Sequence, residues 1–149
     1  MIATPPPRFR SSHAEIGQNG KTVTRAPTLI AAFRFAFAGV GYLLWTQRNA
    51  RIHCAIGLGA VILGLLLRIT RGEWLALVLS IALVLATEGV NTAIEATVDL
   101  ISPYYHPLAK IAKDVAAGTV LLVSIASVII GLIIFLPYML PPVLGWLGL

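Results

Sequence analysis

The sequence has few charged residues and almost no cysteine, and both shortages limit what the protein can be. Charged residues make up 11% of the 149 residues and hydrophobic residues 58%. A soluble domain typically carries about 25% charged residues. The composition therefore indicates a membrane protein of a single domain. Cys54 is the only cysteine, which excludes an internal disulfide and any metal site built from several cysteines.

Basic residues are missing from the C-terminal part of the chain, because all eleven Lys and Arg lie at or before Lys113. They do not alternate with aromatic residues in a stripe, which argues against a nucleic-acid-binding protein. Most of them precede residue 52, two lysines fall in the segment 102–113, and two arginines fall in the turn 68–73. The positive-inside rule then places the N-terminus and the segment 102–113 in the cytoplasm. We expect a multi-pass protein of the plasma (inner) membrane.

The two ends of the chain lack the pattern of membrane-spanning helices. Residues 1–26 are rich in Pro, Ser, Gly and Arg and show no apolar period, so we expect a flexible cytosolic tail. Their arginine and serine content would also suit a transit peptide. Residues 137–149 are apolar but interrupted by prolines, and we expect a C-terminal tail that lies at the membrane interface.

The remaining apolar segments predict an all-α membrane protein. Residues 28–48 repeat apolar side chains at helical spacing, but Arg34 and Gln47 interrupt them. This pattern favours a helix in the membrane interface over a fourth span. A hydrocarbon core of about 30 Å requires about 20 residues of helix. We expect three spans of this kind, at about 52–70, 74–98 and 115–136, the last of them ended by Pro137.

Half of the six acidic residues fall within twelve positions at the end of the second expected span. At 100° per residue, Glu95 and Asp99 lie about 20° to either side of Glu88, and Asn91 lies about 60° from it. Counting from Glu73 at the outer interface places Glu88 roughly 7 Å inside the cytoplasmic boundary of the hydrocarbon. A carboxylate at that depth costs a few kcal/mol. We therefore expect cations beside this stripe.

The segment before the third span can supply those cations. Lys110 and Lys113 lie there with Asp114, and a short loop folded back would bring the lysines near the acidic stripe. Carboxylates bind Mg²⁺ together with substrate phosphates, and lysine binds phosphate as a point charge. The set suits metal-bound triphosphate chemistry at a membrane surface. The alternative is a solvated helix end with lysines that only set topology, although an acid inside the membrane, such as Glu88, is usually functional.

At these residues the chain resembles the small integral-membrane prokaryotic diacylglycerol kinase family, which includes the undecaprenol kinases. The resemblance is carried by Glu88-Gly-Val-Asn91-Thr92-Ala-Ile-Glu95-Ala-Thr-Val-Asp99 and by Ala112-Lys113-Asp114. The segment Arg51-Ile52-His53 is similar to the undecaprenol kinase branch. The resemblance covers about residues 28–136.

The resemblance implies an ATP-dependent lipid kinase that phosphorylates undecaprenol or diacylglycerol at the cytoplasmic face. It implies a homotrimer with active sites shared between subunits. In the family pattern, Glu88 is the general base that takes the proton of the lipid hydroxyl. Asn91 and Lys113 hold the γ- and β-phosphate region of the nucleotide.

The same pattern assigns the metal and nucleotide sites. Glu95 binds Mg²⁺ with the nucleotide, Asp99 and Asp114 support the nucleotide site, and His106 is placed to touch the adenosine. The chain departs from the family at the second metal-binding glutamate, where Gln47 stands. A glutamine carbonyl can bind Mg²⁺ but brings no charge, so we keep Gln47 as a candidate ligand.

Two other functional classes remain as alternatives. A non-catalytic membrane scaffold or an inactive relative is supported only by Gln47. A transporter with proton-relay acids would need acids nearer the centre of the bilayer and more spans than the sequence predicts.

Overall fold

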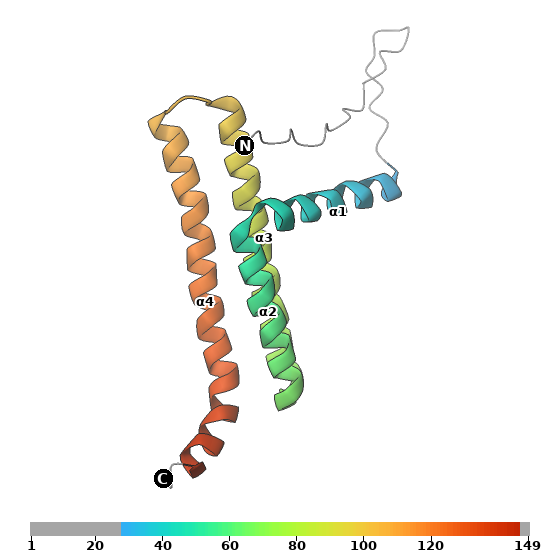
Figure 1. The fold of residues 1–149 in the computed structure, drawn as a ribbon, viewed down its shortest axis with the longest axis vertical. Helices are drawn as coiled ribbons and strands as arrows, with labels where there is room; N and C mark the ends of the chain where they lie inside the picture. The colour runs from blue at the N-terminus through green and yellow to red at the C-terminus, as the bar shows by residue number, and fades with distance from the viewer. Residues whose placement is uncertain (1–27, 147–149) are drawn as a thin grey trace, which may run out of the picture. The chain divides into compact units, whose positions relative to one another are not determined.

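All of the regular structure in the described part of the chain is helical, which confirms the all-α expectation (Figure 1). The structure is a computed structural model that describes residues 28–146, with side chains described to residue 140. Its helices are α1 (Leu29–Thr46), α2 (Arg48–Leu67), α3 (Arg71–Ile101) and α4 (Pro107–Trp146). The expected cytosolic tail, residues 1–26, lies outside the described residues.

Helix α1 extends across the boundary between two units of the chain, residues 1–36 and 37–149. It ends before Gln47, whose backbone is extended (φ −96°, ψ 115°) and separates α1 from α2. None of the residues of α1 is buried. By length and composition, α1 could cross a membrane, as could each of the other three helices. Its position in the membrane interface therefore stays a prediction.

The turn between α2 and α3 is built from backbone and capping hydrogen bonds. Arg68 takes the left-handed conformation (φ 53°), and its N–H donates to the carbonyl of Gly64. Thr70 and Glu73 then form a capping box, in which each side chain accepts a hydrogen bond from the other's backbone N–H. Such a box satisfies N–H groups that the first turn of a helix leaves free. It fixes the start of α3.

Helices α3 and α4 run antiparallel and lie side by side (Figure 1). A buried cluster of Ile69, Leu77 and Ile134 joins the α2–α3 turn, α3 and α4. At the same end, the hydroxyl of Tyr138 donates to a carboxylate oxygen of Glu73 at 2.8 Å. The start of α3 and the C-terminal part of α4 are therefore held together by apolar packing and by a polar contact.

The last helix extends beyond the expected span at both ends, and Pro137 does not end it as predicted. The helix begins at Pro107 rather than near residue 115, because a proline in the first turn needs no N–H partner. It also continues past Pro137 to Trp146. The interfacial position of residues 137–149 stays a prediction. Proline removes one backbone hydrogen bond and bends a helix, but membrane helices tolerate this loss. Figure 1 shows α4 changing direction towards its C-terminal end.

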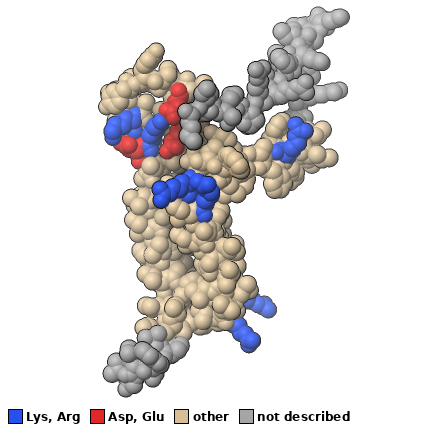
Figure 2. All heavy atoms as spheres, in the orientation of Figure 1, with Lys and Arg blue, Asp and Glu red and all other residues tan. Residues whose placement is uncertain are grey.

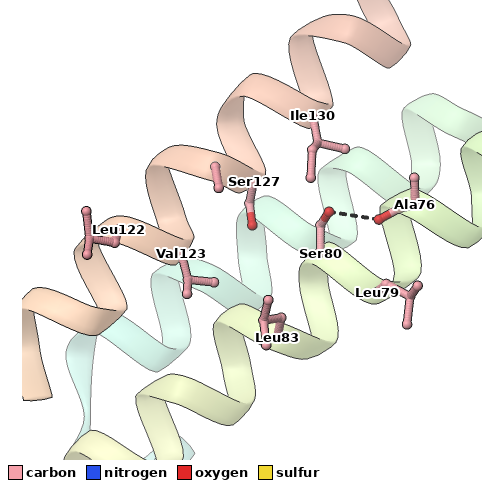
Figure 3. A pocket seen from close by; sticks show the side chains of 9 residues that line it. Ala76, Leu79, Ser80, Leu83, Leu122, Val123, Ser127 and Ile130 are labelled. Atoms are coloured by element: carbon pink, nitrogen blue, oxygen red, sulfur yellow. Dashed lines mark hydrogen bonds between the residues drawn. The ribbon is translucent and has the colours of Figure 1, made fainter.

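A hollow of about 390 Å³ lies along the contact between α3 and α4 (Figure 3). Most of its walls are aliphatic, and the polar side chains among them are Ser80 of α3 and Ser127 of α4. The hydroxyl of Ser80 donates to the carbonyl of Ala76 at 2.7 Å. This bond satisfies the serine donor within its own helix, as a low-dielectric environment requires.

Helix α2 packs closely on the α2–α3 turn at Gly64. A Cβ atom at this position would lie 3.1 Å from Ile69 and 3.2 Å from the ring of Trp74, whereas a Cβ at Gly59 would meet nothing within 4 Å. We expect Gly64→Val to destabilise the fold by about 1–3 kcal/mol, since overpacking forces a buried contact apart. Thermal unfolding in detergent should show this loss. Gly59→Val, on the same helix, should unfold at or above the temperature of the unsubstituted protein.

Candidate active site

The centre of the site is Glu88, whose side chain is only 2% exposed. It lies on α3, beside Gly89 and one turn before the buried polar residues Asn91 and Thr92. Its neighbour one turn on, Thr92, donates its hydroxyl to the carbonyl of Glu88 at 3.0 Å. A buried carboxylate inside an apolar helix is costly and is typical of a functional residue.

Asn91 and Glu95 form a hydrogen-bonded pair on the next turns of α3. The Nδ2 atom of Asn91 donates to Oε1 of Glu95 at 3.1 Å. The opposite amide orientation would place two oxygen atoms against each other, so the contact fixes which way the carboxamide faces. The Oδ1 atom of Asn91 is buried and has no hydrogen-bond partner among the described residues. Since such an orphaned acceptor costs about 1–3 kcal/mol, the arrangement favours a binding role over a purely structural one.

Of the two lysines expected beside the acidic stripe, only Lys113 forms an ion pair with it. Lys113 donates to Asp99 at 2.5 Å and so connects α4 to the stripe on α3. Lys110 instead pairs with Asp114 on its own helix. Both lysines lie on α4 rather than in a loop, because the helix begins earlier than expected. Both pairs are well exposed, and exposed pairs contribute only about 0–1 kcal/mol.

His106 has a structural role that the sequence pattern did not reveal. It immediately precedes α4, and its Nδ1 atom accepts a hydrogen bond from the N–H of Leu108 at 3.2 Å. Its carbonyl accepts the N–H of Lys110 at 3.1 Å. His106 is thus the N-cap of α4, the position where a side-chain acceptor satisfies a free N–H. The cap occupies Nδ1 and leaves Nε2 as the atom that could meet a ligand.

A metal site is only partly formed by the protein. The described residues contain no group of three or more His, Cys, Asp or Glu side chains that could hold a metal ion. Glu95 and Gln47, the two candidate ligands, are both partly exposed. Mg²⁺ is usually bound by one or two carboxylates with substrate phosphates and water completing the shell. The single carboxylate of Glu95, with one oxygen engaged by Asn91, fits that pattern.

Acidic and basic side chains meet at one end of the unit formed by residues 37–149. Figure 2 shows acidic and basic side chains side by side there, and separate basic side chains at the opposite end. The opposite group belongs to the turn that carries Arg68 and Arg71. The acidic stripe and Lys113 therefore come together as the sequence predicts. The catalytic, nucleotide and metal roles of these residues remain predictions.

Comparison with known proteins identifies relatives over most of the chain. The family model described as prokaryotic diacylglycerol kinase matches residues 34–135. A diacylglycerol kinase from Synechocystis is 47% identical over 116 residues, which are 77% of this chain and 66% of that protein. An undecaprenol kinase from Bacillus subtilis is 46% identical over 107 residues, 69% of this chain and 85% of that protein. A diacylglycerol kinase from Pseudomonas aeruginosa is 34% identical over 99 residues, 61% of this chain and 80% of that protein.

The cap at His106 can be tested by hydrogen–deuterium exchange. In His106→Ala the N–H of Leu108 loses its acceptor, so amide exchange in the first turn of α4 should speed up several-fold. His106→Asn should restore slow exchange, because asparagine is a good N-cap residue. Equal exchange in all three proteins would show that the side chain does not cap the helix.

Proposed function

The chain belongs to the prokaryotic diacylglycerol kinase family and is a lipid kinase, and we propose that it transfers the γ-phosphate of ATP to a membrane-embedded alcohol. The acceptor is undecaprenol or diacylglycerol, the substrates that the names of its relatives give. The observation that carries the proposal is the buried carboxylate of Glu88, one helical turn from the polar Asn91–Glu95 pair.

In the proposed reaction, Glu88 is the general base. The hydroxyl oxygen of the lipid attacks the γ-phosphorus, the bond from that phosphorus to the bridging oxygen breaks, and ADP leaves. The hydroxyl proton passes to the carboxylate of Glu88. A base needs to lie within hydrogen-bond reach of the proton that it takes. The burial of Glu88 in the span supports this role, since the hydroxyl of a membrane lipid lies just below the headgroups.

Asn91 and Glu95 would hold the metal-bound phosphates. When Mg²⁺ is bound it neutralises phosphate charge, which is the main requirement of phosphoryl transfer. Glu95 offers a carboxylate oxygen to the ion, and Gln47 would offer its side-chain carbonyl. The Nδ2 atom of Asn91, which donates to Glu95 here, has a second N–H for a γ-phosphate oxygen.

The exposed ion pairs on α4 would bind the rest of the nucleotide. Lys113 contacts the β- and γ-phosphates in this proposal, and it can leave Asp99 at small cost because the pair is exposed. Asp99 and Asp114 support the nucleotide site, and Nε2 of His106 is available for the adenosine. The α3–α4 end that carries these residues faces the cytoplasm, where ATP is found, by the positive-inside rule.

We further propose that the protein is a homotrimer in the inner membrane, as the family resemblance implies. The mass of the protein in detergent, measured by light scattering with the detergent contribution subtracted, tests this. A mass near three times 15.9 kDa supports the trimer, and a monomer mass contradicts it.

A direct assay tests the reaction. We expect the full chain in lipid vesicles to transfer label from γ-labelled ATP to undecaprenol or to diacylglycerol, only when Mg²⁺ is present. The phosphorylated lipid is separated by extraction and thin-layer chromatography. Absence of label in both lipids, from folded protein, would overturn the kinase proposal and favour the non-catalytic alternative.

Glu88→Gln should abolish nearly all turnover, by at least a hundredfold, because the amide cannot take a proton. The helical content and thermal unfolding should remain close to those of the unsubstituted protein, since glutamine has nearly the same shape. Glu73→Gln is the matched control: it alters a carboxylate at the other end of α3 and should leave turnover within a few-fold. Retained activity in Glu88→Gln would exclude Glu88 as the base.

A further inference from the structure

Two arginines lie in the turn between α2 and α3, at the end of these helices opposite the candidate active site. Arg68 follows the last residue of α2, and Arg71 is the first residue of α3. Both side chains are exposed. Figure 2 shows basic side chains projecting from that end, with no acidic side chain beside them on the face in view. We call Arg68 and Arg71 the arginine pair.

The local structure does not favour arginine at position 68. Arg68 has φ 53° and ψ 48°, and it is the single non-glycine residue with a positive φ among the described residues. Glycine adopts this left-handed conformation without steric cost and is the usual residue just after a helix. A glycine here would keep the backbone hydrogen bond to the carbonyl of Gly64 and relieve the strain. The fold itself therefore gives no reason for an arginine.

Arginine is also unfavourable at position 71 and on this side of the membrane. The first turn of a helix carries a partial positive charge and favours acidic residues over basic ones. In the proposed orientation the turn faces away from the cytoplasm, where the positive-inside rule disfavours basic residues. Such electrostatic costs indicate that the two guanidinium groups meet negative charge.

No carboxylate of the described residues supplies that charge. The ion pairs in the described part of the chain both join a lysine to an aspartate at the opposite end. Glu73 lies in the first turn of α3, but its Oε2 atom accepts hydrogen bonds from the N–H and hydroxyl of Thr70 and from the hydroxyl of Tyr138. The arginine pair is therefore available to an anion from outside the chain.

The surface next to the arginine pair is apolar. Leu65 and Leu66 in the last turn of α2 are 64% and 74% exposed, and Leu75 near the start of α3 is 63% exposed. In a membrane such leucines contact acyl chains, and arginine side chains extend their charged ends into the headgroup layer. Guanidinium groups bind phosphate oxygens through pairs of parallel hydrogen bonds. Leucines and arginines together match the two parts of an anionic phospholipid.

We propose that the arginine pair binds the phosphate headgroup of an anionic phospholipid at the membrane surface opposite the active site. This lipid is a bound partner and is neither the acceptor nor the product of the proposed reaction. Two cations favour a headgroup with a net negative charge, such as phosphatidylglycerol. They disfavour phosphatidylcholine, whose ammonium group offsets the charge of its phosphate. The binding goes beyond the proposed kinase function and does not depend on it.

Thermal unfolding in a neutral detergent, with either lipid added and no ATP, tests this site. We expect phosphatidylglycerol to raise the unfolding temperature by several degrees and phosphatidylcholine to have a much smaller effect. Without lipid, Arg68→Gly should unfold at a higher temperature than the unsubstituted protein, because glycine relieves the left-handed backbone. The same variant should nevertheless gain less from phosphatidylglycerol. If Arg68 only stabilised the fold, its replacement would instead lower the unfolding temperature without lipid.

The apparent affinity is the mole fraction of phosphatidylglycerol that gives half of the temperature rise. Arg68→Gly and Arg71→Gln should each increase this mole fraction about fivefold, the factor that one basic residue near a membrane surface contributes. Arg68→Lys keeps the charge and should increase it less. Arg34→Gln is the matched control, because it removes one exposed arginine from α1 and should leave the mole fraction nearly unchanged.

Equal temperature rises with the two lipids, or an unchanged affinity in both Arg68→Gly and Arg71→Gln, would contradict the inference. The same rise with inorganic phosphate at equal phosphate concentration would assign the arginine pair to a free anion and would also contradict it. A changed oligomeric mass in these variants would show that the pair faces another copy, which again excludes a lipid site. None of these results bears on the kinase function, which the turnover assay tests separately.

Discussion

The site depends on one constraint, which is that the carboxylate of Glu88 must remain inside an apolar helix. An acidic side chain inside the hydrocarbon of a membrane costs a few kcal/mol, and Glu88 is almost completely buried. The stripe that continues from it towards Asp99 becomes progressively more exposed, through the partly exposed Glu95. The solvent exposure of the acids thus increases along the stripe. The buried end suits a lipid hydroxyl, and the exposed end suits a charged nucleotide.

The antiparallel pairing of α3 and α4 holds α4 beside the acidic stripe of α3. Two polar contacts join the helices, Glu73 with Tyr138 at one end and Asp99 with Lys113 at the other. The intervals between them are 26 residues on α3 and 25 on α4, so the helices keep one register. That length corresponds to about 39 Å, more than the hydrocarbon thickness of about 30 Å. The contacts can therefore lie at opposite membrane surfaces, with the apolar seam between them.

Sequence reasoning predicted the helices and the acidic stripe because both follow from local periodicity. It placed Glu88, Glu95 and Asp99 together from angles alone, and it recognised Lys113 as a partner. It failed at Pro137, because the tolerance of a proline depends on the surroundings of the helix. It also missed the cap at His106, since histidine is not a usual N-cap residue.

Gln47 is the position at which this chain departs from the pattern that its family resemblance implies. If this position binds the metal, as the resemblance implies, glutamine brings one negative charge fewer than glutamate and leaves Glu95 as the acidic candidate ligand. In the proposed mechanism the phosphates would then supply more of the Mg²⁺ coordination. The protein's own contribution shifts from holding the metal to positioning the acceptor. Holding a lipid hydroxyl beside the buried Glu88 is the kind of positioning that such a site requires.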